Sequence, residues 1–179
     1  MKNVCIISAS PRKNSNSARL GDAFCEGARA AGHNVTVYSL AGKSIGFCKG
    51  CGACHTTHTC VQQDDAAVIC AALAAADVIV FATPVYYYSM SGQLKTLLDR
   101  TTPHYDTDYN FRDIYLLATA EDTDDCTFDG TLTALMGWIS CFPKARLAGL
   151  VRGYGVNAPG DIGKHPNYLR EAVMLGKNL

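Results

Sequence analysis

The chain has no surplus of charge of either sign and no long apolar run. Its 179 residues include 16 Lys and Arg and 16 Asp and Glu, so the formal net charge is zero. No segment concentrates basic residues, which argues against nucleic acid or an anionic membrane as a partner. Asp or Lys interrupts the apolar stretches well before the ~20 residues that a membrane helix needs. The composition therefore predicts a soluble, globular protein.

An export signal is also missing. The chain enters a strand-like run at Asn3, with no basic leader followed by an apolar segment and a small-residue cleavage site, so we expect a cytoplasmic protein. The cysteine count is odd, at nine, and this argues against a disulfide framework. Five cysteines have apolar neighbours and are predicted to pack in the core as small hydrophobic side chains: Cys5, Cys25, Cys70, Cys126 and Cys141.

Buried strands alternate with amphipathic helices along the chain. Short apolar runs predict five strands, at residues 3–8, 35–40, 78–82, 114–118 and 145–156. Apolar residues at helical spacing predict five helices, at residues 17–31, 64–76, 92–100, 128–139 and 167–177. This alternation predicts a single α/β domain over residues 1–179. Its expected fold is a flavodoxin-like, doubly wound, five-stranded parallel sheet of order 2-1-3-4-5, with helices on both faces.

A polar loop follows the first strand. Ser10, Ser15 and Ser17 supply hydroxyls, Arg12 a guanidinium and Asn16 an amide, and the next helix begins with free backbone amides. Ligands of doubly wound sheets bind beyond the carboxyl ends of the strands, here after strands one and three. The glycine-rich dinucleotide fingerprint and the Walker A motif are both absent, so the loop predicts a mononucleotide phosphate site. The alternative is an ordinary helix cap.

The loop after the third strand carries three consecutive tyrosines, Tyr86 to Tyr88. Neighbouring side chains in a loop point in different directions, so at least one ring is free to stack on a planar ligand such as isoalloxazine. Backbone amides of this loop can donate to a ring edge that gains negative charge on reduction. The alternative is an aromatic loop that packs at a subunit interface.

Two segments, SPRKNSNS at 10–17 and ATPVYYYSMSGQLKTLLDR at 82–100, resemble the NADPH-dependent FMN reductase and iron-sulfur flavoprotein group. The resemblance covers most of the chain and implies an oxidoreductase that passes electrons from NADH or NADPH through FMN to a small acceptor. It also implies a homodimer or homotetramer. No catalytic side chain is expected, because the flavin does the chemistry. The implied FMN-binding residues are Ser10, Arg12, Ser15, Asn16, Ser17, Pro84, Val85, Tyr86, Tyr87, Thr119 and Ala120.

Two positions depart from this family's pattern. Ala9 stands where the family often has Gly before the first Ser, which alters how closely the backbone can approach a phosphate. Glu121 and Asp122 stand after the fourth strand, where many members have Gly. A 2'-phosphate favours Arg or Lys, so these acids leave the choice between NADH and NADPH open.

Four cysteines lie in the long loop after the second strand, with the spacing C-x2-C-x2-C-x5-C: Cys48, Cys51, Cys54 and Cys60. Glycines between them permit tight turns, and the pattern resembles the motif that ligates a [4Fe-4S] cluster in iron-sulfur flavoproteins. The spacing fits a zinc site less well, because structural zinc sites usually divide their ligands into two separated pairs. Free or redox-active thiols are the alternative, since relatives with a similar pattern carry FMN alone. With a cluster, the chain is expected to be an iron-sulfur flavoprotein or a flavodoxin-like electron carrier between redox proteins.

Overall fold

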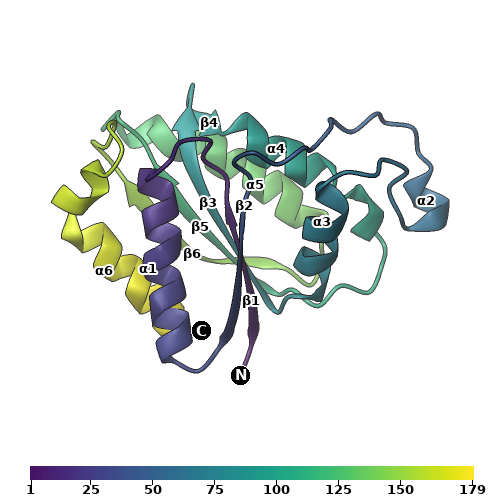
Figure 1. Ribbon diagram of the computed structural model, residues 1–179, viewed down its shortest axis with the longest axis horizontal. Helices are drawn as coiled ribbons and strands as arrows, with labels where there is room; N and C mark the ends of the chain where they lie inside the picture. Colours follow the sequence, from purple (N-terminus) through teal and green to yellow (C-terminus); the bar gives the residue numbers. More distant parts are fainter.

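A computed structural model describes residues 1–179, which form one parallel sheet between two layers of helices (Figure 1). The sheet has the strand order β2-β1-β3-β5-β6, and a short strand, β4, pairs antiparallel with β3. The strands are β1 (Asn3–Ser8), β2 (Asn34–Ser39), β3 (Val78–Tyr86), β4 (Ser89–Met90), β5 (Asp113–Thr119) and β6 (Arg146–Gly153). The predicted order of five parallel strands is confirmed, and β4 is an addition that the sequence analysis left within a loop.

Helices cover both faces of the sheet, as predicted (Figure 1). On one face lie α1 (Asn16–Ala30) and α6 (Pro166–Lys177), and on the other lie α3 (Ala66–Ala75), α4 (Gly92–Asp99) and α5 (Asp129–Ser140). The remaining helices are short: α2 (Cys54–Thr57), η1 (Thr102–His104), η2 (Asp125–Phe128) and η3 (Asp161–Lys164). None of the helices is both long and apolar enough to cross a bilayer.

The buried side chains form two cores, one on each side of the sheet. Successive residues of a strand point to opposite faces, so Cys5 and Ile7 of β1 join the core under α3, α4 and α5. Val4 and Ile6 join the core under α1 and α6. Burial of both faces explains why the strands read as continuous apolar runs in the sequence.

Three of the five predicted core cysteines are buried: Cys5, Cys25 and Cys70. Burial raises the pKa of both the Cys5 and the Cys70 thiol to about 12, so these two remain protonated at neutral pH. The prediction was wrong for Cys126 and Cys141, which are exposed. Cys126 lies in the 3-10 helix η2 and Cys141 caps the end of α5, so their apolar neighbours pack inward while the thiols face solvent.

Helices α1 and α6 pack with their backbones in close contact. A Cβ atom at Gly27 of α1 would overlap the carbonyl oxygen of Val173, and one at Gly176 of α6 would overlap that of Phe24. Only glycine fits at these two positions. The contact holds α6, and the segment that leads into it, firmly against α1.

A buried hydrogen-bond cluster joins three segments at the carboxyl edge of the sheet. The Ser91 hydroxyl donates to the carbonyl of Ala9 at 3.2 Å, and the Ser91 backbone N–H donates to the Thr83 hydroxyl at 3.1 Å. The Ser91 hydroxyl also accepts from the N–H of Leu94, which caps α4. Because Ser91 and Thr83 are fully buried, this cluster fixes the start of the β1–α1 loop (residues 9–15) against the end of β3.

Candidate functional site

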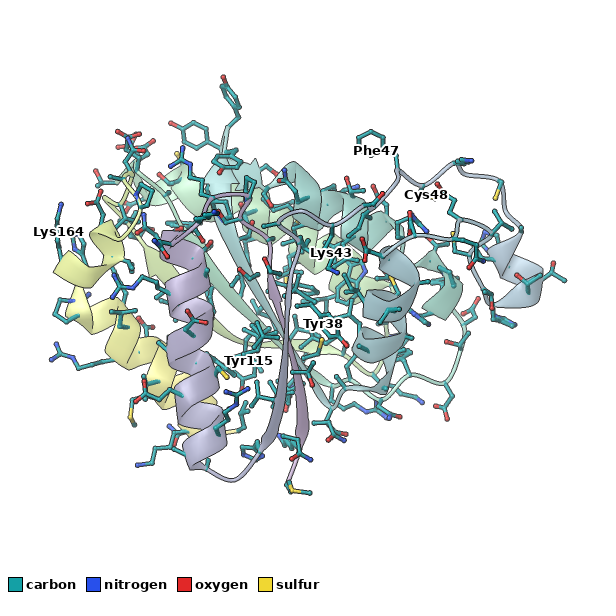
Figure 2. The ribbon with its side chains drawn as sticks, viewed as in Figure 1. Tyr38, Lys43, Phe47, Cys48, Tyr115 and Lys164 are labelled. Carbon is teal, nitrogen blue, oxygen red and sulfur yellow. The ribbon has the colours of Figure 1, made fainter.

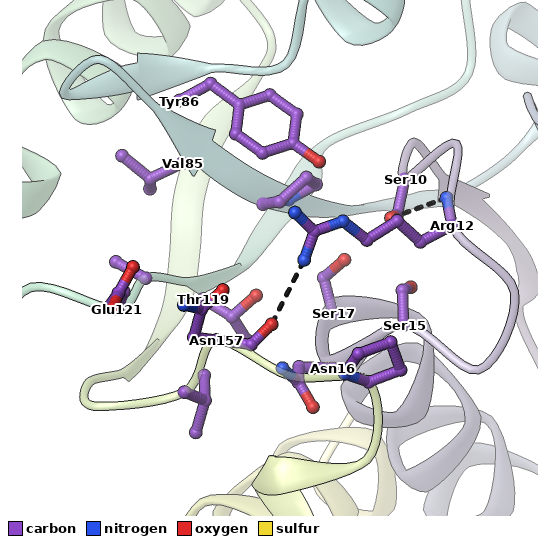
Figure 3. A pocket seen from close by; sticks show the side chains of 14 residues that line it. Ser10, Arg12, Ser15, Asn16, Ser17, Val85, Tyr86, Thr119, Glu121 and Asn157 are labelled. Carbon is purple, nitrogen blue, oxygen red and sulfur yellow. Dashed lines mark hydrogen bonds between the residues drawn. The ribbon is translucent and has the colours of Figure 1, made fainter.

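A cavity of about 170 Å³ lies beyond the carboxyl ends of the strands, where the β1–α1 loop meets the ends of β3, β5 and β6 (Figure 3). It brings together every predicted FMN-binding residue except Tyr87. The cavity is lined by Ser10, Arg12, Ser15, Asn16, Ser17, Pro84, Val85, Tyr86, Thr119, Ala120, Glu121, Val156, Asn157 and Pro159. Residues far apart in the sequence therefore converge where the doubly wound topology predicts a ligand.

The serines of this cavity differ in the bonds that they already make. The Ser15 hydroxyl caps α1 by accepting from the N–H of Ala18 at 3.1 Å, and the Ser10 hydroxyl accepts from the N–H of Arg12 at 3.2 Å. The Ser17 hydroxyl lines the cavity at 1% exposure and has no hydrogen-bond partner. A buried hydroxyl without a partner is costly. Together with the positive N-terminal end of α1, it makes this corner of the cavity suitable for an anion such as phosphate.

Asn16 lines the cavity, but both ends of its amide are bonded to the segment after β6. Its Nδ2 donates to the carbonyl of Ala158 at 3.0 Å, and its Oδ1 accepts from the N–H of Ile162 at 3.1 Å. The Arg12 guanidinium reaches across the cavity and donates to the carbonyl of Asn157 at 3.1 Å (Figure 3). The segment after β6 is thus held in place by the same loop that was predicted to bind phosphate.

The sequence analysis missed the wall formed by Val156, Asn157 and Pro159. It extended the fifth strand to residue 156, whereas β6 ends at Gly153 and the chain then turns along the cavity. The turn-forming sequence Gly-Val-Asn-Ala-Pro-Gly at 155–160 was the available signal. It follows a parallel strand and therefore had to lie at the edge where the other site residues gather.

Tyr87 lies outside this cavity, at the tight turn between β3 and β4. Tyr87 and Tyr88 both have left-handed backbones, with φ of 49° and 60°, as a two-residue hairpin turn requires. The turn places the Tyr87 side chain entirely in solvent. The residue borders a second cavity, of about 430 Å³, which adjoins the first by sharing Val85, Ala120 and Glu121.

The four-cysteine loop forms a separate site. In Figure 2 the loop that carries Phe47 and Cys48 arches away from the sheet at one end of the molecule. Cys48, Cys51, Cys54 and Cys60 all line one cavity of about 110 Å³, and all are free thiols. No three His, Cys, Asp or Glu side chains lie close enough together to hold a metal ion. The structure thus brings the predicted ligands to one cavity without arranging them as a coordination shell.

Arg100, which the sequence analysis did not single out, attaches this loop to the C-terminal end of α4. Its side chain is 1% exposed and pairs with Asp64 through both terminal nitrogens, at 2.6 and 3.1 Å. It also donates to the carbonyl of Gly46 at 2.8 Å and to the sulfur of Cys60 at 3.3 Å. The Arg100 guanidinium lowers the pKa of the Asp64 carboxyl. One buried cation therefore holds both ends of the loop from residue 46 to residue 64.

Comparison with protein families gives a match over residues 2–124, to the family described as NADPH-dependent FMN reductase. The match includes the β1–α1 loop, the four-cysteine loop and the ends of β3 and β5. It ends before the segment after β6 that forms the remaining wall of the cavity.

Curated proteins that match part of this chain in sequence carry the name iron-sulfur flavoprotein. One, from Archaeoglobus fulgidus, is 36% identical over 104 residues, which cover 58% of this chain and 47% of the relative. Another, from Methanosarcina thermophila, is 38% identical over 95 residues, covering 53% of this chain and 50% of the relative. The matches therefore extend over only about half the length of these relatives.

Solved structures share the fold at low sequence identity. An NAD(P)H:quinone oxidoreductase from Methanothermobacter marburgensis superposes with a TM-score of 0.76 at 20% identity, covering 99% of this chain and 95% of the other. An FMN-dependent NADH-azoreductase from Bacillus anthracis, solved in complex with FMN, superposes with a TM-score of 0.69 at 15% identity, covering 99% of each chain. These likenesses establish the flavodoxin-like architecture.

The buried Arg100–Asp64 pair generates a stability prediction. Asp64→Asn leaves the Arg100 guanidinium without its countercharge and should lower the free energy of unfolding at pH 7 by about 3 kcal/mol. The pKa of Asp64 is lower in the folded than in the unfolded chain. Its contribution is therefore complete above the unfolded value, about 4, and is lost as the pH falls through the folded value. In urea unfolding, the difference in free energy of unfolding between wild type and Asp64→Asn should become smaller as the pH is lowered.

The exposed pair Lys95–Asp99 provides the matched control for this measurement. Asp99→Asn removes a carboxylate from an ion pair of similar length and should change the free energy of unfolding by no more than about 0.5 kcal/mol. The role assigned to the Arg100–Asp64 pair would be contradicted if Asp64→Asn lost as little free energy of unfolding as the control. It would also be contradicted if the difference from wild type stayed constant with pH.

Proposed function

Because the chain belongs to the NADPH-dependent FMN reductase family, we propose that it is an FMN-dependent oxidoreductase. In this proposal it passes electrons from NADH or NADPH to a small acceptor of the quinone type. The observation that carries the proposal is the unpartnered Ser17 hydroxyl, buried at the N-terminal end of α1 in the cavity at the switch point of the sheet. A phosphate monoester would satisfy both the hydroxyl and the free amides of the helix.

The cavity residues divide into those that suit the phosphate of FMN and those that suit its remainder. Ser10, Arg12 and Ser17 lie with the first turn of α1 and would bind the phosphate. Arg12 would exchange the carbonyl of Asn157 for a phosphate oxygen, a stronger, charge-assisted partner. Ser15 and Asn16 would act mainly through the bonds that they already make, by capping α1 and by holding the segment after β6.

The remaining lining groups suit the ribityl chain and the ring: Pro84, Val85, Tyr86, Thr119 and Ala120. Thr119 and Ala120 are almost completely buried, whereas Tyr86 is partly exposed at the mouth of the cavity. When bound, FMN supplies hydride and electron transfer. These side chains would orient the ring and exclude water from its inner side, and Tyr87 would lie beyond it, in the adjoining cavity.

A second candidate function is that of an iron-sulfur electron carrier. Four thiols line one cavity, and the relatives with 36% and 38% identity are named iron-sulfur flavoproteins. In number and chemistry the donors suit a [4Fe-4S] cluster, and Cys48, Cys51, Cys54 and Cys60 would hold it. Because the thiols do not form a coordination shell, the loop would have to close around the cluster.

The assembly of the chain into a homodimer or homotetramer also stays a prediction.

The proposed function is tested by one set of spectra. Purified protein mixed with FMN should retain the flavin through gel filtration, and NADH or NADPH should bleach its absorbance under anaerobic conditions. Addition of a quinone should restore the oxidised spectrum. Bound flavin that neither nucleotide reduces would favour the carrier over the reductase, and failure to retain FMN would contradict both.

Ser17→Ala separates a ligand-binding role from a structural one. The substitution removes one charge-assisted hydrogen bond to phosphate, so the Kd for FMN, followed by fluorescence quenching, should rise about tenfold. The apoprotein should be as stable as wild type or more so, because an unpartnered hydroxyl is lost. Ser15→Ala is the matched control and should lower apoprotein stability by about 1 kcal/mol through loss of the α1 cap. An unchanged Kd for Ser17→Ala would count against the phosphate site.

The iron-sulfur alternative predicts iron and sulfide in equal amounts in anaerobically reconstituted protein, with a broad visible absorbance beyond that of flavin. Cys51→Ser should abolish this absorbance, because it removes one of four thiolate ligands. Cys141→Ser changes an exposed thiol outside the loop and should leave it intact. Protein without iron after reconstitution would leave the four-cysteine loop as free thiols and the reductase as the remaining function.

A further inference from the structure

The second cavity lies directly beside the proposed FMN site. It measures about 430 Å³, is open to solvent, and shares Val85, Ala120 and Glu121 with the first cavity. Its own lining residues are Tyr87, Tyr88, Asp122 and Thr127. A molecule bound here would lie next to whatever occupies the first cavity, as a second substrate must.

Acidic residues without ion-pair partners occur at this cavity and in the segment that follows it along the chain. Five carboxylates occur within nine residues, at Glu121, Asp122, Asp124, Asp125 and Asp129. None of the five forms an ion pair, whereas six other aspartates of the chain do. Two of them, Glu121 and Asp122, line the cavity, and their negative charge favours a cation at its mouth.

The cavity also contains a buried hydroxyl beside one of its carboxylates. Thr127 is 1% exposed, and its side chain is among the groups that lower the pKa of Asp122, so the hydroxyl faces that carboxylate. The strongest cause of the lowered pKa is the hydrogen bond that Asp122 accepts from the Tyr88 hydroxyl at 2.7 Å. The Asp122 carboxylate therefore stays charged at neutral pH.

One aromatic ring completes the lining. Tyr88 is half exposed beside Asp122, whereas the β3–β4 turn directs the Tyr87 ring into solvent. Exposed tyrosine faces bind planar rings and attract positive charge through their π electrons. The aromatic and acidic groups of this cavity therefore favour the same kind of ligand.

We propose that the second cavity binds the electron acceptor of the proposed reductase, and that it selects planar aromatic acceptors with a positive charge over those with a negative charge. The inference rests on the proposed function. Overall, NAD(P)H, one proton and a quinone give NAD(P)⁺ and the hydroquinone, with two electrons transferred. The charge that the cavity recognises is carried by a substituent that takes no part in this reaction.

Three 1,4-naphthoquinones that carry a quaternary ammonium, a methyl or a sulfonate substituent test the proposal. FMN-loaded protein is reduced anaerobically with one equivalent of NADH or NADPH and then mixed with each quinone in a stopped-flow instrument. Comparison of wild type with Glu121→Gln removes differences in quinone potential, because each acceptor serves as its own reference. The Glu121 carboxylate makes no ion pair or hydrogen bond, so the substitution removes charge and breaks no contact.

For Glu121→Gln, the second-order rate constant should fall roughly fourfold for the ammonium quinone and rise by a similar factor for the sulfonate, as expected for one charge near the ligand. The methyl quinone reports the effect of the substitution on the flavin itself, and the changes for the other two quinones are taken relative to it. Added salt should reduce both changes. Asp124 lies outside the FMN cavity. Asp124→Asn should change the rate constants for the charged quinones in the same directions but by smaller factors.

Glu26→Gln combined with Glu171→Gln is the control, since it neutralises exposed acids on α1 and α6. It should leave the order of the three quinones as in wild type. Equal effects of Glu121→Gln on all three quinones, or no effect on any, would overturn the inference. Reduction of the flavin by NADH or NADPH is recorded in the first step, so failure of the proposed function is detected separately.

Discussion

The position of β1 between β2 and β3 is the constraint on which the remaining structure depends. From β1 the chain leaves to α1 on one face of the sheet, and from β3 it leaves through β4 to α4 on the other. The loops after β1 and β3 therefore diverge, and a cavity opens between them. The buried Ser91 hydroxyl then fixes how far apart they lie, because it joins Ala9 and Thr83 within one hydrogen-bond cluster. The groups proposed to bind the phosphate, Ser10, Arg12 and Ser17, take their positions from this divergence.

Much of the fold could be predicted from sequence because both faces of the sheet are buried. Continuous apolar runs and helical periodicity located five strands and five helices within a few residues. The topology indicated that the loops after strands one and three meet, and the resemblance to the FMN reductase group added Thr119 and Ala120 to the same site. The two-residue strand β4 was missed, because its pairing depends on the left-handed turn at Tyr87 and Tyr88, and no propensity favours that conformation for tyrosine.

Contacts between distant side chains were the part that local patterns could not predict. Asn16 was assigned to the ligand because of its place in the loop, yet its amide bonds to Ala158 and Ile162, more than 140 residues away. The buried pair of Arg100 and Asp64 depends in the same way on how α4 packs against the four-cysteine loop. Cys126 shows a related limit: apolar neighbours indicate a buried segment but do not indicate which way each side chain points.

Arg100 anchors both ends of the four-cysteine loop to the C-terminal end of α4. Its two terminal nitrogens donate to Asp64, to the carbonyl of Gly46 and to the sulfur of Cys60, so the two ends of the loop meet in the folded chain itself. With both ends of the loop anchored, any movement that brings Cys48, Cys51 and Cys54 nearer to Cys60 has to come from bending within the loop, because the loop cannot shift as a whole.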